Sequence, residues 1–193
     1  MSYKLLALLT IVWAVRADIY YDIGDDDYSE VRNSRNFTGK VVLVTGSNSG
    51  IGEKIVDLFS ALGASVVITG RNESEIQRVA TEVQKLSPKG LKACVVADVL
   101  KTQDLENLIS QTIKTFGRLD VLVNNAGASL STNIKDKNFI QVFDQLLNLN
   151  TRAGLELIHL AVPHLEAVNG TIISTSSIWS SPLLTAIRHQ EIN

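Results

Sequence analysis

From residue 40 onward, short apolar runs alternate with longer stretches in which apolar residues recur every three or four positions. The runs are rich in β-branched residues, which is typical of strands covered on both faces. They are residues 40–45, 64–70, 91–98, 118–127 and 170–177. The periodic stretches predict helices over residues 51–62, 76–86, 105–116 and 138–165. Strands that alternate with helices pair in parallel through right-handed crossovers, so the pattern predicts an α/β fold, a doubly wound parallel sheet of the Rossmann type.

Residues 1–36 do not follow this alternation. Residues 1–17 combine an early lysine, an apolar run over residues 5–15 and a V-R-A step that ends at Ala17, which is typical of a secretory signal peptide. Since spanning a bilayer takes roughly 20 residues, we expect no stable membrane span, and an anchor on the membrane surface is the alternative. Residues 18–36 are acidic and then basic without an apolar face, which predicts an acidic linker. The expected location is the secretory pathway, as a secreted or luminal protein.

Composition and charge exclude some classes of function. Of the 193 residues, 45% are hydrophobic and 20% charged, so residues 37–186 are enough for one domain with its own core. A formal net charge of −2 argues against nucleic acid as a partner, because such binders carry a basic patch. Cys94 is the only cysteine, and its apolar neighbours predict a buried strand residue. The sequence also lacks the paired-histidine spacing of a metal site, so no metal is expected.

A glycine-rich segment separates the first predicted strand from its helix. It consists of Thr45, Gly46, Ser47, Asn48, Ser49, Gly50, Ile51 and Gly52. Glycines let the backbone turn sharply next to a pyrophosphate, and the following helix directs its unpaired N–H groups and positive dipole end at that anion. A tight turn between strand and helix is the alternative interpretation. Because the segment lies in the first strand-helix-strand unit, the sequence favours a dinucleotide site.

Several motifs in this order resemble the short-chain dehydrogenase/reductase family. They are the G-x-x-x-G-x-G spacing of residues 46–52, the Asp98-Val99 pair after the third predicted strand, the NNAG run at residues 124–127, and a serine after the fifth strand. The resemblance covers residues 37–182. It implies a nicotinamide-dependent oxidoreductase that interconverts an alcohol and a carbonyl on a small-molecule substrate. Family members often associate through the long helix, which makes a homo-oligomer a candidate assembly.

The resemblance also assigns cofactor contacts. It implies that Asp98 meets the adenine edge and that Val99 lines the adenine pocket. The run of Asn125, Ala126 and Gly127 would pass close to the ribose.

The end of the second predicted strand indicates which dinucleotide is bound. An acidic residue there would grip the ribose 2′-hydroxyl of NAD, but this sequence has Gly70 followed by Arg71. A guanidinium can meet a 2′-phosphate with two parallel hydrogen bonds, so the sequence predicts NADP(H). The alternatives are a solvent-exposed cation for Arg71 and a ribose contact from Glu73.

By the same resemblance, two residues belong to the reaction centre. Asn150, in the long predicted helix, matches the asparagine that anchors a water relay in the family. Ser177, after the fifth predicted strand, matches the serine that polarises the substrate oxygen, with Ser176 as the second choice. The alternatives are a polar residue inside a helix for Asn150 and a hydroxyl that caps a strand end for Ser177.

The tyrosine and lysine of that reaction centre have no counterpart in the sequence. The family uses a tyrosine, whose ordinary pKa is about 10, and a lysine four positions later that lowers it. The tyrosines Tyr3, Tyr20, Tyr21 and Tyr28 precede the domain, and no lysine follows Lys137. We therefore expect an incomplete domain, truncated after strand five, with a divergent tail at residues 187–193. The chain would be an oxidoreductase that is inactive in this form or, alternatively, a non-catalytic dinucleotide-binding module.

An incomplete sheet has a physical consequence. The fifth strand would become an edge, and part of the sheet would lose its helical cover. The sequence therefore predicts low solubility or dependence on a partner.

Overall fold

The computed structural model describes residues 35–87, 91–130 and 132–176. Its strands are β1 (Val41–Val44), β2 (Ser65–Gly70), β3 (Lys92–Val96), β4 (Val121–Asn124) and β5 (Thr171–Ser174). Its helices are α2 (Gly50–Ala61), α3 (Glu73–Leu86), α4 (Thr102–Phe116), α5 (Phe139–Leu147), the π-helix η1 (Asn148–Arg152) and α6 (Ala153–Glu166). None of the helices in these ranges has the length and apolar character that crossing a membrane requires.

The strands form one parallel sheet in the order β3-β2-β1-β4-β5. β1 is central: its Val42 lies opposite Val66 of β2 on one side and Val121 of β4 on the other. The chain moves outward from β1 to β2 and β3, and then crosses to β4 and β5. Such a reversal leaves a crevice at the carboxyl ends of the strands on either side of it, here β1 and β4. The predicted doubly wound α/β fold is confirmed.

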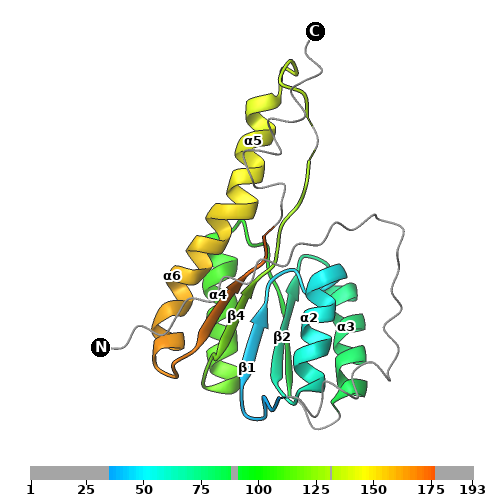
Figure 1. The fold of residues 1–193 in the computed structure, drawn as a ribbon, viewed down its shortest axis with the longest axis vertical. Coiled ribbons are helices and arrows are strands. Elements are labelled where there is room, and N and C mark those ends of the chain that lie inside the picture. The colour runs from blue at the N-terminus through cyan, green and yellow to red at the C-terminus, as the bar shows by residue number, and fades with distance from the viewer. Residues whose placement is uncertain (1–34, 88–90, 131, 177–193) are drawn as a thin grey trace.

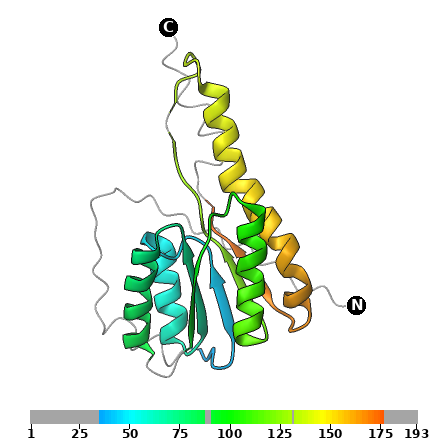
Figure 2. The same cartoon turned by 180° about the vertical axis from the view of Figure 1, so that it is seen from behind.

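Helices cover both faces of this sheet (Figures 1 and 2). Successive residues of a strand point to opposite faces, so Val42 and Val44 join the core under α2 and α3, while Leu43 joins the core under α4 and α6. Each fully buried side chain of this kind contributes about 1.5–3 kcal/mol. Because both faces are apolar, the strands read as unbroken apolar runs in the sequence.

The long helix predicted over residues 138–165 is not regular. It is divided into α5, the five-residue π-helix η1 and α6. α6 packs on the sheet through Ala153, Leu157, Ala161 and Leu165, whereas α5 has no buried residue. Figure 1 shows why, since α5 extends past the carboxyl ends of the strands. The apolar periodicity of residues 138–147 therefore does not reflect burial in this core.

Within the described residues, the two edge strands of the sheet are less buried than its central strands. Cys94 is exposed, so the prediction of a buried cysteine is wrong. β3 is an edge strand, and only the face that carries Val95 is covered by core residues. β5 forms the other edge, pairs only with β4 and keeps Ile172 and Ile173 half-buried. The expected edge position of the fifth strand is thus observed in the described part of the chain.

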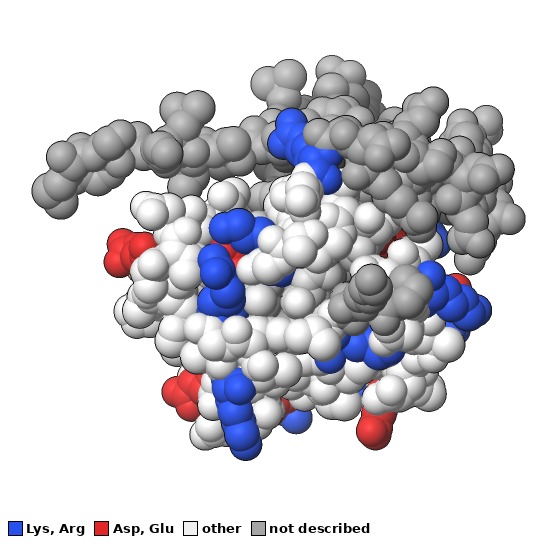
Figure 3. Space-filling model, turned by 90° about the horizontal axis from the view of Figure 1, so that it is seen from below, with Lys and Arg blue, Asp and Glu red and all other residues white. Residues whose placement is uncertain are grey.

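Figure 3 shows the molecule from the end at which the strands begin, opposite α5. Lys and Arg side chains are spread over the described surface there, with Asp and Glu between them. At this end, the Asp120 carboxylate accepts hydrogen bonds from the Val41 N–H, Lys40 Nζ and the Arg118 guanidinium at 2.6–3.0 Å. This network fastens β4 to the start of β1. The candidate site lies at the opposite end of the strands.

Candidate functional site

The glycine-rich segment connects the carboxyl end of β1 to α2. Gly46 and Gly50 have φ of +64° and +58°, which side-chain-bearing residues rarely adopt. Ser47 fastens the turn to β2: its N–H donates to the Thr69 carbonyl at 3.0 Å, and its hydroxyl accepts from the Thr69 N–H at 2.9 Å. The turn is therefore held against the end of the neighbouring strand. A Cβ added at Gly52 would collide with the Gly46 carbonyl, so this glycine permits close packing of helix on turn.

The N-terminus of α2 is open toward solvent. Its N-cap residue, Ser49, makes no side-chain capping hydrogen bond, whereas Asn72 caps α3 by accepting from the Ser74 and Glu75 N–H groups. Ile51 in the first turn of α2 is 66% exposed, and a Cβ at Gly50 would meet no atom within 4 Å. Unpaired N–H groups at a helix N-terminus form a site for a phosphate. The glycine-rich segment at residues 45–52, called the cradle below, therefore fits a diphosphate.

Thr45 joins the cradle to the NNAG run. Its buried hydroxyl accepts hydrogen bonds from the N–H groups of Asn125 and Ala126, both at 2.9 Å. The Asn125 side chain donates to the Thr45 carbonyl at 3.0 Å. The predicted cofactor residues after β1 and after β4 are therefore brought together in one structure.

Asn150 connects the long helix to this loop. It lies in η1, and its side chain both accepts from the Ala128 N–H and donates to the Ala128 carbonyl at 2.9 Å. A Cβ added at Gly127 would lie 3.1 Å from the same side chain. The structure places Asn150 at the predicted site, with its amide engaged in fixing the loop after β4.

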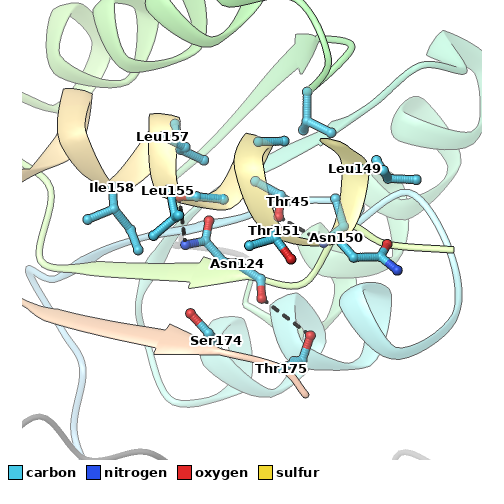
Figure 4. A pocket seen from close by; sticks show the side chains of 14 residues that line it. Thr45, Asn124, Leu149, Asn150, Thr151, Leu155, Leu157, Ile158, Ser174 and Thr175 are labelled. Atoms are coloured by element: carbon cyan, nitrogen blue, oxygen red, sulfur yellow. Dashed lines mark hydrogen bonds between the residues drawn. The ribbon is translucent and has the colours of Figure 1, made fainter. Parts of the chain in front are cut away.

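A cavity of about 210 Å³ lies between β4, β5 and the start of α6 (Figure 4). Asn124 contributes its polar wall: its amide nitrogen donates to the Gly154 carbonyl at 3.4 Å, while its buried Oδ1 has no partner in the described structure. Thr175 donates to the Asn124 carbonyl at 3.3 Å, and Ser174 lies beside it on β5. Leu157 and Ile158 form the apolar wall. The cavity thus combines an unused acceptor with hydroxyl groups and aliphatic carbon.

The remaining predicted site residues are more peripheral. Arg71 directly follows β2 and is exposed, as a ligand contact from solvent would require. Asp98 accepts from the Leu100 N–H at 3.1 Å. Val99 is half-buried, packs against the core under α4 and lines the cavity. Ser176 follows β5, but Ser177 lies outside the described residues.

One group beside the cradle was not predicted from the sequence. Arg78 of α3 donates two hydrogen bonds to the Glu53 carboxylate, at 3.0 and 2.8 Å, one to Glu75 at 2.8 Å and one to the Asn48 carbonyl at 3.5 Å. The hydrogen bonds from Arg78 lower the pKa of Glu53, and those to Glu53 and Glu75 raise the pKa of Arg78. Glu75 and Arg78 are one helical turn apart, which a sequence can indicate. The pairing with Glu53 depends on how α2 and α3 pack.

Comparison with known proteins defines the class. The family model for short chain dehydrogenases matches residues 40–184. The chain belongs to the short chain dehydrogenase family, whose members are oxidoreductases that bind nicotinamide dinucleotides.

Relatives with established names share the same region. L-fucose dehydrogenase of Bos taurus is 39% identical over 142 residues, which make up 74% of this chain and 50% of that protein. The 11-beta-hydroxysteroid dehydrogenase-like 4A of Arabidopsis thaliana is 36% identical over 146 residues, 76% of this chain and 48% of that protein. The chain thus spans about half the length of these relatives.

Solved structures agree on the fold. A 7α-hydroxysteroid dehydrogenase complexed with NADH and 7-oxo glycochenodeoxycholic acid superposes with a TM-score of 0.70 at 30% identity, over 77% of this chain and 56% of that one. A short-chain dehydrogenase/reductase of unknown function from Caenorhabditis elegans, solved with cofactor, gives 0.69 at 36% identity, over 76% and 55%.

Proposed function

We propose that this chain binds NADP(H) as part of a short-chain oxidoreductase that interconverts an alcohol and a carbonyl on a small molecule. The observation that carries the proposal is the end of β2, where Gly70 is the last residue of the strand and the exposed Arg71 follows it beside the open cradle. The cradle would hold the diphosphate through backbone N–H groups and the positive end of α2.

Arg71 supports the choice of NADP(H) over NAD(H). Within the described residues its side chain has no hydrogen-bond or salt-bridge partner, in contrast to Arg78, which pairs with two carboxylates. A guanidinium that is not neutralised by a carboxylate can form two parallel hydrogen bonds with a 2′-phosphate. A glycine at position 70 also removes the carboxylate that would repel this group.

The bound nicotinamide would supply the hydride. The chain's own residues would orient the substrate: Asn150 holds the loop after β4, and Ser177 would polarise the reacting oxygen. No Tyr-x-x-x-Lys occurs in the sequence, and a phenol assisted by lysine is the family's proton donor. We therefore propose that this chain, although it derives from an oxidoreductase, binds the dinucleotide without turning it over. The second candidate function is a module that binds the dinucleotide and has no catalytic role.

Location and assembly extend the proposal. Residues 1–17 would direct the chain to the secretory pathway, and residues 18–36 would link that signal to the domain. Most of that segment and the tail at residues 187–193 lie outside the described residues. Self-association would use the long helix, where large apolar side chains are exposed.

Titration of the purified chain with NADPH and NADH, followed by nicotinamide fluorescence, tests the proposal. Arg71→Asp should weaken NADPH binding about 10- to 150-fold, because hydrogen bonds to charged groups contribute about 1.5–3 kcal/mol. NADH binding should be unchanged or stronger. Arg35→Asp makes the same charge change away from the cradle and serves as the control. If the unmodified chain prefers NADH, or if Arg71→Asp leaves the preference unchanged, the NADP(H) assignment is wrong.

A further inference from the structure

The side chain of Asn48 lies directly over Gly70. A Cβ added at Gly70 would collide with Asn48 Oδ1 and would lie 2.5 Å from Asn48 Cγ. Gly70 itself is part of β2, and its φ lies outside the left-handed region that favours glycine. The backbone therefore permits any residue at position 70. What excludes a side chain there is the contact with Asn48.

The backbone of Asn48 is held from two sides. Its carbonyl accepts the 3.5 Å hydrogen bond from Arg78, whose guanidinium is clamped by Glu53 and Glu75. The preceding residue, Ser47, is fastened to Thr69 by the hydrogen bonds described above. These hydrogen bonds oppose a shift of this backbone. The Asn48 side chain would instead have to rotate into the space above the cradle.

The Asn48 amide is not used elsewhere in the described structure. The two buried polar side chains of the turn between β1 and α2, those of Thr45 and Ser47, both have backbone partners. Asn48 is half-buried, and within the described residues only its main-chain carbonyl takes part in a hydrogen bond. An amide offers both donors and an acceptor, so it suits a phosphate or a hydroxyl equally well.

We infer that Asn48 is a specificity-determining residue for the dinucleotide: it closes position 70 to an acidic side chain and presents its amide to the 2′-substituent of the adenosine ribose. This inference rests on the proposed function. It implies that positions 48 and 70 act as a pair. Introducing an aspartate at position 70 alone would drive Asn48 into the ligand space, so that neither NADPH nor NADH binds well.

The experiment is a double-mutant cycle on the full chain with Gly70→Asp, Asn48→Ala and the two combined. Affinity for NADPH and for NADH is measured for each. Gly70→Asp alone should weaken both at least tenfold, and Asn48→Ala in that background should restore NADH binding to the level of the unmodified chain or better. The inference is overturned if Gly70→Asp alone improves NADH binding as much as the double variant does.

Thermal melting without dinucleotide separates this inference from the proposed function. Asn48→Ala should recover at least half of the loss in melting temperature that Gly70→Asp causes. A matched control is Gly154→Ala, since a Cβ there would be no closer than 3.6 Å to the atoms around it, and Asn48→Ala should not alter its effect. If the unmodified chain binds neither dinucleotide, the proposed function fails, but the melting temperatures still test whether Asn48 excludes a side chain at position 70. If Asn48→Ala recovers none of the melting temperature lost in Gly70→Asp, that steric claim is wrong.

Discussion

Thr45 is the residue on which the junction between the two cofactor loops depends. Its hydroxyl is the acceptor for the N–H groups of both Asn125 and Ala126, and the residue is 3% exposed. Thr45→Val keeps the shape and removes the acceptor. Each unsatisfied N–H costs about 1–3 kcal/mol, and because both donors are half-buried we take the lower end, about 2 kcal/mol in total.

Thr45→Ser is the matched control. It keeps the hydroxyl and loses one methyl group, which costs about 0.8 kcal/mol. For chains of roughly 150–250 residues, 1 kcal/mol shifts the melting temperature by about 2–4 °C. The valine variant should therefore melt about 4–8 °C below the unmodified chain, and the serine variant about 2–3 °C below it. Affinity for NADPH should fall in the same order, because the turn after β1 and the loop after β4 are no longer held together when the Thr45 hydroxyl is lost. A valine variant at least as stable as the serine variant would refute the reasoning.

Two further predictions concern the ends of the sheet. Burial alone would raise the pKa of Asp120, but the hydrogen bonds from Arg118, Val41 and Lys40 outweigh it and hold the pKa below its ordinary value. The stability that this carboxylate provides is therefore complete above the unfolded pKa of about 3.9 and is lost as the pH falls through the lower folded value. In urea titrations, the difference between the unmodified chain and Asp120→Asn should be largest near neutral pH and vanish at strongly acidic pH; a difference that grows on acidification would contradict this. Asn150→Ala should release Ala128 and increase amide hydrogen exchange at residues 127–128, whereas Asn148→Ala, a neighbour in η1, should not; equal effects would contradict a specific tether.

The sequence was sufficient for the architecture because each parallel strand is buried on both faces. Residues such as Val42, Leu43 and Val44 must then all be apolar, whichever helix covers them. The cradle was predictable for a similar reason. Its turn needs left-handed backbone at Gly46 and Gly50, and few residues other than glycine supply it.

The features that were missed depend on tertiary packing. The burial of Cys94 was predicted from its neighbours, but whether a strand lies at an edge is decided by the sheet order. No local sequence pattern indicated that Asn150 would lie in a π-helix rather than in a regular helix. Arg78 and Glu53 are 25 positions apart, so nothing local indicates that they meet. The assignment of Ser177 stays a prediction.

The exposed face of α5 leads to a prediction about association. Ile140, Phe143 and Leu147 are 64%, 51% and 48% exposed, and their spacing of three and four positions places them on one stripe. A contiguous apolar surface of this kind is uncommon on a soluble monomer. We expect the chain to self-associate, and light scattering coupled to size-exclusion chromatography should show a species larger than one chain.

Charge placed on this stripe should reverse the association. Ile140→Lys with Phe143→Lys should shift the chain toward the monomer, because a lysine ammonium must lose its hydration to enter an apolar contact. Gln141→Lys with Gln145→Lys adds the same charge to the opposite side of the helix and should have a much smaller effect. If the unmodified chain is a monodisperse monomer that melts cooperatively, the stripe does not drive association. If both pairs of substitutions dissociate it equally, net charge rather than the apolar face is responsible.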